Sequence, residues 1–357
     1  MIKRILKVVA LTLLLLLAVA GGIELGFGRW FSQNPLDLAG IKHDSVGVVD
    51  SRRFFVDGEQ FLLRYDSWGF RGSPGEPSRI AVLSLGGQSV HQSLLPEDKT
   101  WQQVLQAQFQ ASQRDDVIVA NAGRSGYGAQ AVSAALRQWL PHVPGLHPRF
   151  VLVMVGDQGV APLLTQTVND PVIAEFNQSY QALLGRLTAF AGGMEKSGVV
   201  RVLASAFPPK LGGPVPAGWS VPLPVVKAGE WRDVTLPPAD SPHLADFRQT
   251  LKQIADDIHN NGAVPVFVTV ARGNYRYFGG KDQEMPLSLP VAGVPTAALA
   301  AYNASTRAVC REHGFLCLDL AREVKFEPND FYDYVHYSPK GADKIGRWLY
   351  SKLAGLV

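Results

Sequence analysis

A serine follows a short apolar run in the first third of the chain, and an aspartate and a histidine lie close together near its end. Ser89 comes after 85–88, Leu-Gly-Gly-Gln, where paired glycines permit the sharp turn that lifts a side chain above a sheet edge. Asp333 and His336 are close enough for one loop to present both to the same cleft. A histidine oriented by a carboxylate can take the proton of a serine hydroxyl. These residues predict nucleophilic catalysis by Ser89, with Asp333 and His336 as its base.

The same chemistry needs donors for the oxyanion that forms during acyl transfer. Gly123 follows a second apolar run, and Gln158 lies in Gly-Asp-Gln-Gly after a third. The Gly123 backbone N–H and the Gln158 amide are therefore the expected donors. Each feature has an ordinary alternative, because Gly-Gly-x-Ser often caps a helix and a surface Asp and His can simply solvate a loop.

Other features of the sequence argue against a different base, a metal site and a nucleic-acid partner. His91 is close to Ser89, but on the opening turn of a helix it is expected to be a rim or packing residue rather than the base. We find no His/Cys/Glu cluster with metal-ligand spacing and expect no metal or other cofactor. The formal charge is only +3, from 34 basic and 31 acidic residues without long like-charged blocks. A nucleic-acid partner is therefore not expected.

Short apolar runs alternate with longer amphipathic ones from residue 79 onward, as expected for elements that hold such a site. The expected strands are 80–85, 117–120, 150–155, 264–270 and 315–318. The expected helices are 101–110, 129–140, 173–190, 244–259, 296–312 and 339–353. Continuous apolar strands separated by helices predict an α/β, doubly wound, flavodoxin-like parallel sheet with helices on both faces.

Two stretches break this alternation. Residues 199–204 are expected to form an extra strand, and 207–242 holds nine prolines, which exclude a regular helix or central strand. We expect 207–242 to be a partly ordered flap over the site. A second irregular stretch, 273–290, is expected to form another wall of the cleft.

The amino-terminal segment predicts a membrane helix. Lys3, Arg4 and Lys7 precede an uncharged run over 8–23, and the positive flank places the amino terminus in the cytoplasm. We expect a single-pass anchor over 1–24 in the inner, cytoplasmic membrane, a lead-in segment over 25–78, and an extracytoplasmic, periplasmic domain over 79–357. The alternative is a signal peptide cleaved after Ala18-Val19-Ala20.

If the domain is exported, its two cysteines have two alternative states. Cys310 falls near the end of an expected helix and Cys317 in the expected strand after it. They could form a disulfide in an oxidising compartment, or remain two buried thiols.

Together these blocks resemble the SGNH, or GDSL, hydrolase superfamily over roughly residues 64–355. Residues 65–72 are similar to the lead-in of its membrane-anchored bacterial members, 121–126 to its second block, and 336–341 to its last block. The resemblance implies a Ser89, His336 and Asp333 mechanism, with Gly123, Gln158 and the Ser89 amide as the oxyanion hole.

Two blocks depart from the common pattern. The expected Gly-Asp-Ser is Gly87-Gln88-Ser89, and 156–159 replaces Gly-x-Asn-Asp. A strict alignment of the glycines would place Gln88 at the nucleophile position. The sialate O-acetylesterase-like branch is similar to this chain at both places, and that resemblance retains Ser89.

The expected function is serine ester hydrolysis that removes O-acetyl groups from envelope or exported carbohydrate. The partners are then an acylated carbohydrate or another small ester, and the membrane. One alternative is a polysaccharide O-acetyltransferase with the same triad. Another is a catalytically silent binding or assembly subunit with a protein partner in the envelope, motivated by the two altered blocks.

Overall fold

A five-stranded parallel sheet forms the centre of the molecule. The computed structural model describes residues 2–29, 32–53, 58–156, 196–206, 210–211, 231–285, 296–332 and 336–357. The strand order is β11-β8-β5-β3-β4, and each neighbouring pair is parallel. The strands are β3 (Ile80–Gly86), β4 (Ile118–Asn121), β5 (Phe150–Met154), β8 (Val264–Val268) and β11 (Leu316–Leu318). All five predicted strands and the doubly wound parallel sheet are confirmed.

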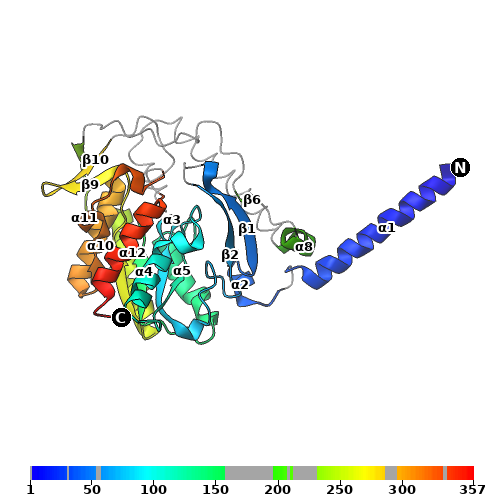
Figure 1. Cartoon of the computed structure of the whole chain (residues 1–357), viewed down its shortest axis with the longest axis horizontal. Helices are drawn as coiled ribbons and strands as arrows, with labels where there is room; N and C mark the ends of the chain where they lie inside the picture. The colour runs from blue at the N-terminus through cyan, green and yellow to red at the C-terminus, as the bar shows by residue number, and fades with distance from the viewer. Residues whose placement is uncertain are drawn as a thin grey trace.

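Helices cover both faces of this sheet. The longer ones are α4 (Trp101–Ala111), α5 (Ala129–Gln138), α9 (Pro242–Asn260), α10 (Thr296–His313) and α12 (Pro339–Leu353). The chain steps from β3 outward to β4 and then back past β3 to β5. Right-handed crossovers therefore put α4 on one face and α5 on the other. The packing agrees, because α4 lies against α12 (Figure 1), while α9 contacts both α5 and α10.

The reversal of direction beside β3 fixes where a ligand can bind. In an open α/β sheet the crevice lies beyond the carboxyl ends of the strands, where the strand order reverses. Here that point is the end of β3, next to β5. The short helix α3 (Gln88–His91) begins there. The predicted helix over 173–190 lies outside the described residues.

The lead-in segment folds against the main body as an antiparallel pair. Strands β1 (Ser45–Asp50) and β2 (Gln60–Tyr65) pair in full register, and β6 (Lys210–Leu211) adds to β1. Strand β6 is a described part of the predicted flap over 207–242. The remaining short helices are α2 (Pro35–Leu38) and α11 (Leu320–Glu323). Single 3-10 turns cover Ser51–Arg53, Pro77–Arg79, Glu97–Lys99, Leu140–His142 and Pro328–Asp330.

The stretch predicted to be irregular, 273–290, forms a hairpin in its described part. Strands β9 (Tyr275–Phe278) and β10 (Lys281–Glu284) are antiparallel, and β7 (Arg232–Asp233) pairs with β10. The turn is Gly279-Gly280, and both glycines have a positive φ, of 60° and 81°. Two residues with positive φ are what a tight two-residue hairpin turn requires. The prediction of irregular structure there was wrong.

The extra strand predicted over 199–204 is a helix, α8 (Gly198–Ala206). Its first N–H groups are satisfied by a carboxylate from far away in the sequence. Glu24 accepts hydrogen bonds from the Gly198 N–H at 2.8 Å and from the Ser197 hydroxyl. A short valine-rich run does not distinguish strand from helix by its period, and this tertiary cap decides for helix.

Helix α1 (Ile2–Phe27) projects away from the rest of the chain (Figure 1). Its most apolar 18-residue window has a mean hydropathy of 2.5, and none of that window is buried against the protein. It is long and apolar enough to cross a membrane.

Cys310 and Cys317 are free thiols in the structure. They lie close together, and the Cys317 thiol, followed by burial, raises the pKa of Cys310 above its usual range. Of the two alternatives, the structure therefore has the reduced pair.

Candidate active site

The turn between β3 and α3 brings the backbone unusually close to the neighbouring strand. Gly86 has φ +156°, and a Cβ there would lie 2.1 Å from the Met154 carbonyl oxygen of β5. Only glycine fits such an approach. Gly87 then caps α3, Gln88 is the first residue of the helix and Ser89 the second. The Gly-Gly pair therefore makes the sharp strand-to-helix turn that the sequence predicts.

A small hollow lies beside this turn. Its lining comes from two parts of the chain: Gln88, Gln92, Leu94 and Leu95 on one side, and His336 and Tyr337 on the other. The fold thus brings His336 to the first turn of α3 from the far end of the sequence. Tyr337 is fixed there by packing against Phe331, at 5.1 Å between ring centroids. Asp333 lies outside the described residues.

Ser89 is not among the described residues that line this hollow. The residue is 1% exposed, and its backbone carbonyl accepts a hydrogen bond from the Trp101 indole at 3.0 Å. Gln88 is the residue of the turn that shares the hollow with His336. Gln88 is also the residue that a strict alignment of the glycines places at the nucleophile position.

Gly123 follows β4 at the same edge. Its backbone N–H donates to the Asn121 side-chain oxygen at 2.9 Å. A Cβ on Gly123 would lie 2.5 Å from the His91 backbone nitrogen and 2.8 Å from Val90. Glycine is therefore required here because α3 packs directly on it. Gln158, the other expected oxyanion donor, lies outside the described residues.

Two buried side-chain amides donate hydrogen bonds to α3. The Val90 carbonyl accepts from Asn121 Nδ2 and from Gln102 Nε2, both at 2.9 Å. Gln92 ends the helix with φ 51°, a left-handed conformation that is strained for a residue with a side chain. Its amide donates to Gln102 Oε1 at 2.8 Å, which compensates for part of that strain.

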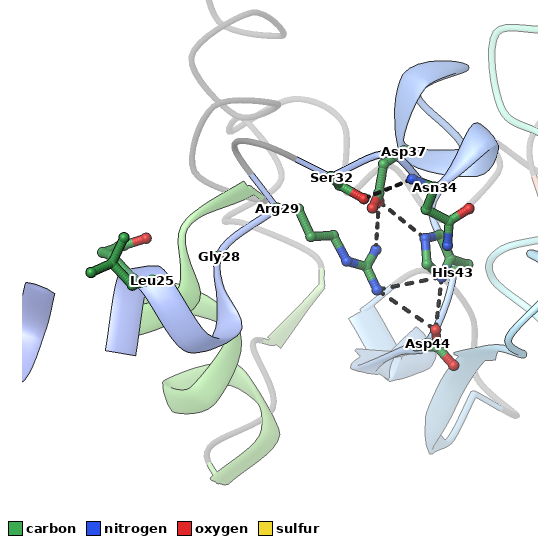
Figure 2. A pocket seen from close by; sticks show the side chains of 9 residues that line it. Leu25, Gly28, Arg29, Ser32, Asn34, Asp37, His43 and Asp44 are labelled. Carbon is green, nitrogen blue, oxygen red and sulfur yellow. Dashed lines mark hydrogen bonds and ion pairs between the residues drawn. The ribbon is translucent and has the colours of Figure 1, made fainter. Parts of the chain in front are cut away.

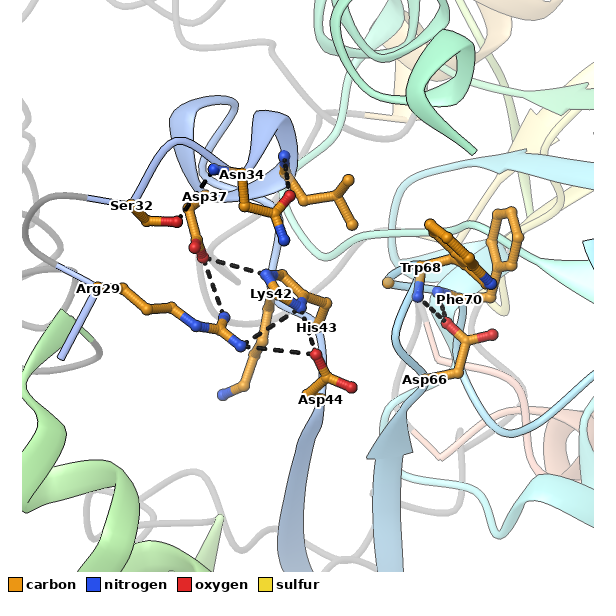
Figure 3. Close-up of polar contacts among 12 residues, drawn as sticks. Arg29, Ser32, Asn34, Asp37, Lys42, His43, Asp44, Asp66, Trp68 and Phe70 are labelled. Atoms are coloured by element: carbon orange, nitrogen blue, oxygen red, sulfur yellow. Dashed lines mark hydrogen bonds and ion pairs between the residues drawn. The ribbon is translucent and has the colours of Figure 1, made fainter. Parts of the chain in front are cut away.

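The lead-in motif over 65–72 supplies a buried cation to the same helix. The Asp66 carboxylate accepts from the Trp68 and Phe70 N–H groups at 3.0 and 2.8 Å, which shapes the turn (Figure 3). Arg71 follows and donates to the carbonyls of His91, Gln92 and Leu95, the second at 2.7 Å. Burial lowers the pKa of Arg71 to about 10, so it stays charged at neutral pH. The guanidinium therefore fixes the carboxyl end of α3.

A hydrogen-bonded chain of three side chains was missed by the sequence analysis. His91 Nε2 lies 2.6 Å from the Tyr65 hydroxyl, and His91 Nδ1 lies 2.9 Å from Ser125 Oγ. His91 is 5% exposed, so it is buried. Tyr65 and Ser125 each belong to a motif that the sequence singled out, but nothing in the spacing indicates that both contact His91.

A second polar pocket, of about 480 Å³, lies where α1 meets the lead-in segment. Figure 2 shows Arg29 pointing at Asp37, His43 and Asp44. Arg29 contacts Asp37 at 3.0 Å, and the buried His43 ring lies between Asp37, at 3.0 Å, and Asp44, at 2.7 Å. Figure 3 shows that this cluster joins the segment after α1 to the start of β1. This cluster is the joint between α1 and the lead-in segment.

Comparison with known proteins gives a family match over most of the chain. The model of the GDSL-like lipase/acylhydrolase family matches residues 85–344. A search of curated protein sequences finds no match.

Solved structures of that family are similar at low identity. A member of the lipolytic G-D-S-L family from Veillonella parvula is 11% identical, with 77% of this chain and 96% of the other covered and a TM-score of 0.41. An acetyl-xylooligosaccharide esterase from Geobacillus Stearmophilus is 11% identical, with coverages of 76% and 93% and a TM-score of 0.42. A carbohydrate acetylesterase from Sinorhizobium meliloti is 10% identical, with coverages of 78% and 100% and a TM-score of 0.42.

Proposed function

Because this chain belongs to the GDSL-like lipase/acylhydrolase family and carries its hydrolase domain, we propose that it hydrolyses short-chain O-acyl esters at the carboxyl edge of β3. The observation that carries the proposal is the convergence of His336 with the first turn of α3 in one hollow. A base and a strand-to-helix turn brought together from distant parts of the sequence are the parts that acyl transfer needs.

The proposed mechanism uses the residues expected from the sequence. Ser89 attacks the ester carbonyl, His336 takes its proton and returns it to the departing alcohol, and Asp333 holds the imidazole in the required tautomer. Gly123, Gln158 and the Ser89 amide stabilise the oxyanion, for which the Gly123 N–H must leave its hydrogen bond to Asn121 Oδ1. Water then releases the acyl group, again with His336 as base. Because Ser89 is 1% exposed, its hydroxyl must become accessible when an ester enters.

A short acyl group is proposed from the sequence, because residues 87–89 and 156–159 resemble the corresponding blocks of the sialate O-acetylesterase-like branch. Together with an extracytoplasmic location, which we propose from the charges flanking α1, this supports an O-acetylated carbohydrate of the cell envelope as substrate.

A chain-length series tests the proposal. We expect the purified full-length protein, in detergent, to hydrolyse 4-nitrophenyl acetate faster than 4-nitrophenyl decanoate. His336→Ala should lower kcat for the acetate by roughly 100-fold, the contribution of a general base. Ser112→Ala is the control, because that exposed hydroxyl contacts Tyr350 and lies at the end of α4. Equal rates for both esters, or an unchanged rate in His336→Ala, would contradict the proposal.

One observation favours a second candidate function. Gln88 rather than Ser89 lines the hollow, and an amide can bind a carbonyl but cannot attack it. The alternative is a catalytically silent site that binds an acetylated sugar. It predicts no turnover of either ester, together with calorimetric binding of O-acetylated glucose that Gln88→Ala weakens.

A further inference from the structure

The Ser125, His91 and Tyr65 chain has the geometry of an activated hydroxyl. Ser125 is exposed, and its Oγ lies 2.9 Å from His91 Nδ1, within the range of a nucleophile paired with its base. The other ring nitrogen, Nε2, lies 2.6 Å from the Tyr65 hydroxyl, which fixes the ring. The Tyr65 and His91 rings are also stacked, with centroids 5.8 Å apart and 17° between their planes. A hydroxyl, an imidazole and an orienting group are therefore aligned.

The surroundings of His91 keep its imidazole neutral. Burial, followed by the charges of Arg71 and Arg124, holds the pKa of His91 well below its usual range. His336 and Lys42 add smaller contributions in the same direction. A neutral imidazole has one N–H and one free lone pair. The Tyr65 hydroxyl oxygen also accepts from Arg124. In the tautomer that carries the proton on Nε2 and donates it to Tyr65, the Nδ1 lone pair faces the Ser125 hydroxyl and can accept its proton.

Ser125 also lies at the edge of the sheet where the ester is proposed to bind. It follows β4, which pairs with β3 with a register shift between Ile80 and Val82, and the segment between β4 and Ser125 packs on α3 through Gly123. His91 is the last residue of α3, the helix whose first residue lines the hollow with His336. Ser125 is thus an exposed serine at this edge of the sheet, whereas Ser89 is buried.

We propose that Ser125 is a second nucleophile of this edge, with His91 as its base and Tyr65 as the positioning residue that holds His91, an inference that rests on the proposed ester hydrolysis. Ser125 Oγ bonds to the ester carbonyl carbon while its proton moves to His91 Nδ1. The tetrahedral intermediate expels the alcohol, which takes that proton. Water then attacks the acyl group, its proton passes through His91 Nδ1 to Ser125 Oγ, and the carboxylic acid leaves.

A mapped covalent label tests this directly in the full-length protein. A fluorophosphonate phosphonylates activated serines, and peptide mass spectrometry locates the adduct. We expect Ser89→Ala to keep an adduct on Ser125 and to hydrolyse 4-nitrophenyl acetate within roughly 100-fold of the unmutated rate. Adding Ser125→Ala should abolish both, whereas adding Ser112→Ala should change neither. Thermal unfolding of each variant checks that it is folded.

Two further variants test the roles of the base and of Tyr65. In the Ser89→Ala background, His91→Gln should slow labelling by roughly 100-fold. Tyr65→Phe keeps the stacked ring and removes the hydroxyl, and it should lower kcat while KM stays unchanged. A rise in KM alone would show that Tyr65 does not act through His91.

The outcomes separate this inference from the proposed function. If the unmutated protein carries its label on Ser89 and Ser89→Ala loses both label and turnover, Ser125 is not a nucleophile and ester hydrolysis stands. If the unmutated protein shows neither label nor turnover, ester hydrolysis itself is overturned.

Discussion

At the scale of single residues, His91 links the site to the stability of the fold. An unfolded histidine has a pKa of about 6.5, and burial with nearby Arg71 and Arg124 holds the folded value well below that. Between the two values the unfolded chain binds more protons than the folded one. The contribution of His91 is therefore complete above about pH 6.5 and is lost as the pH falls below it, by about 1.4 kcal/mol per pH unit.

We accordingly expect the free energy of unfolding to fall as the pH is lowered from 7 to 5. His91→Gln should remove part of this slope, and His142→Gln, at an exposed histidine, should leave it unchanged. Urea denaturation at several pH values measures both slopes. Identical slopes in the two variants would show that His91 is not neutral in the folded state.

The lowered pKa of His91 should also determine the pH dependence of hydrolysis through Ser125. His91 must be neutral to accept a proton, so its lowered pKa extends activity to more acidic pH. We expect the residual turnover of Ser89→Ala to be retained from pH 7 to pH 5.5. A loss of activity centred near pH 6.5 would contradict the assignment of His91 as the base.

Gly123 tests how tightly α3 is seated. An alanine Cβ there would lie 2.5 Å from the His91 backbone nitrogen, so α3 would have to move. Overpacking of this kind costs about 1–3 kcal/mol. We expect Gly123→Ala to lower the Tm by several degrees, whereas Gly355→Ala, which has nothing within 4 Å, should not. Equal Tm values in calorimetry would mean that α3 is loosely held.

From the sequence, site residues that lie within one local motif could be predicted. Contacts between residues of different motifs could not. The Gly-Gly turn and His336 were recognisable because a local pattern marks each of them. The contact of His91 with Tyr65 and Ser125 depends on how β2, α3 and the loop after β4 pack together. Spacing along the chain carries no information about that packing.

At the scale of elements, α3 depends on Arg71 more than on its own length. A four-residue helix is too short to be stable by itself. Arg71 satisfies carbonyls at its carboxyl end and just beyond, and it is 5% exposed. The lead-in segment therefore holds the site although it lies outside the central sheet.

Arg71→Met should remove this support and leave buried carbonyls without donors. We expect a loss of about 3 kcal/mol in the free energy of unfolding, since each unsatisfied buried group costs about 1–3 kcal/mol. Arg137→Met is the matched control, because its ion pair with Asp257 is exposed and such pairs contribute less than about 1 kcal/mol. Comparable losses in urea denaturation would argue against a special role for Arg71.

Elements with a strong local signal were predicted correctly, and those set by distant contacts were not. The five central strands are apolar on both faces, and Ser338 and Pro339 mark the start of α12. Helix α8 was predicted to be a strand because the residue that caps it, Glu24, lies in α1 and gives no local signal near 198–206. The β9–β10 hairpin was missed although Gly279-Gly280 is a recognised hairpin signal.

At the scale of the whole molecule, α1 is long and apolar enough to cross a membrane, and the polar joint after it connects it to the hydrolase domain. We propose that α1 is retained as an anchor with its positively charged end in the cytoplasm. Fractionation should then find the chain in membranes after carbonate washing, with its amino terminus intact by mass spectrometry. A mature chain that begins at Gly21 would instead show that a signal peptide is cleaved after Ala20.

The central claim is that this chain cleaves esters through a serine acyl intermediate. Its most direct test is the intact mass of the full-length protein after reaction with excess fluorophosphonate. The account predicts at least one phosphonyl adduct per chain, together with loss of 4-nitrophenyl acetate hydrolysis in proportion to labelling. An unchanged mass in a folded protein would contradict it, and the hollow at Gln88 and His336 would then be a binding site.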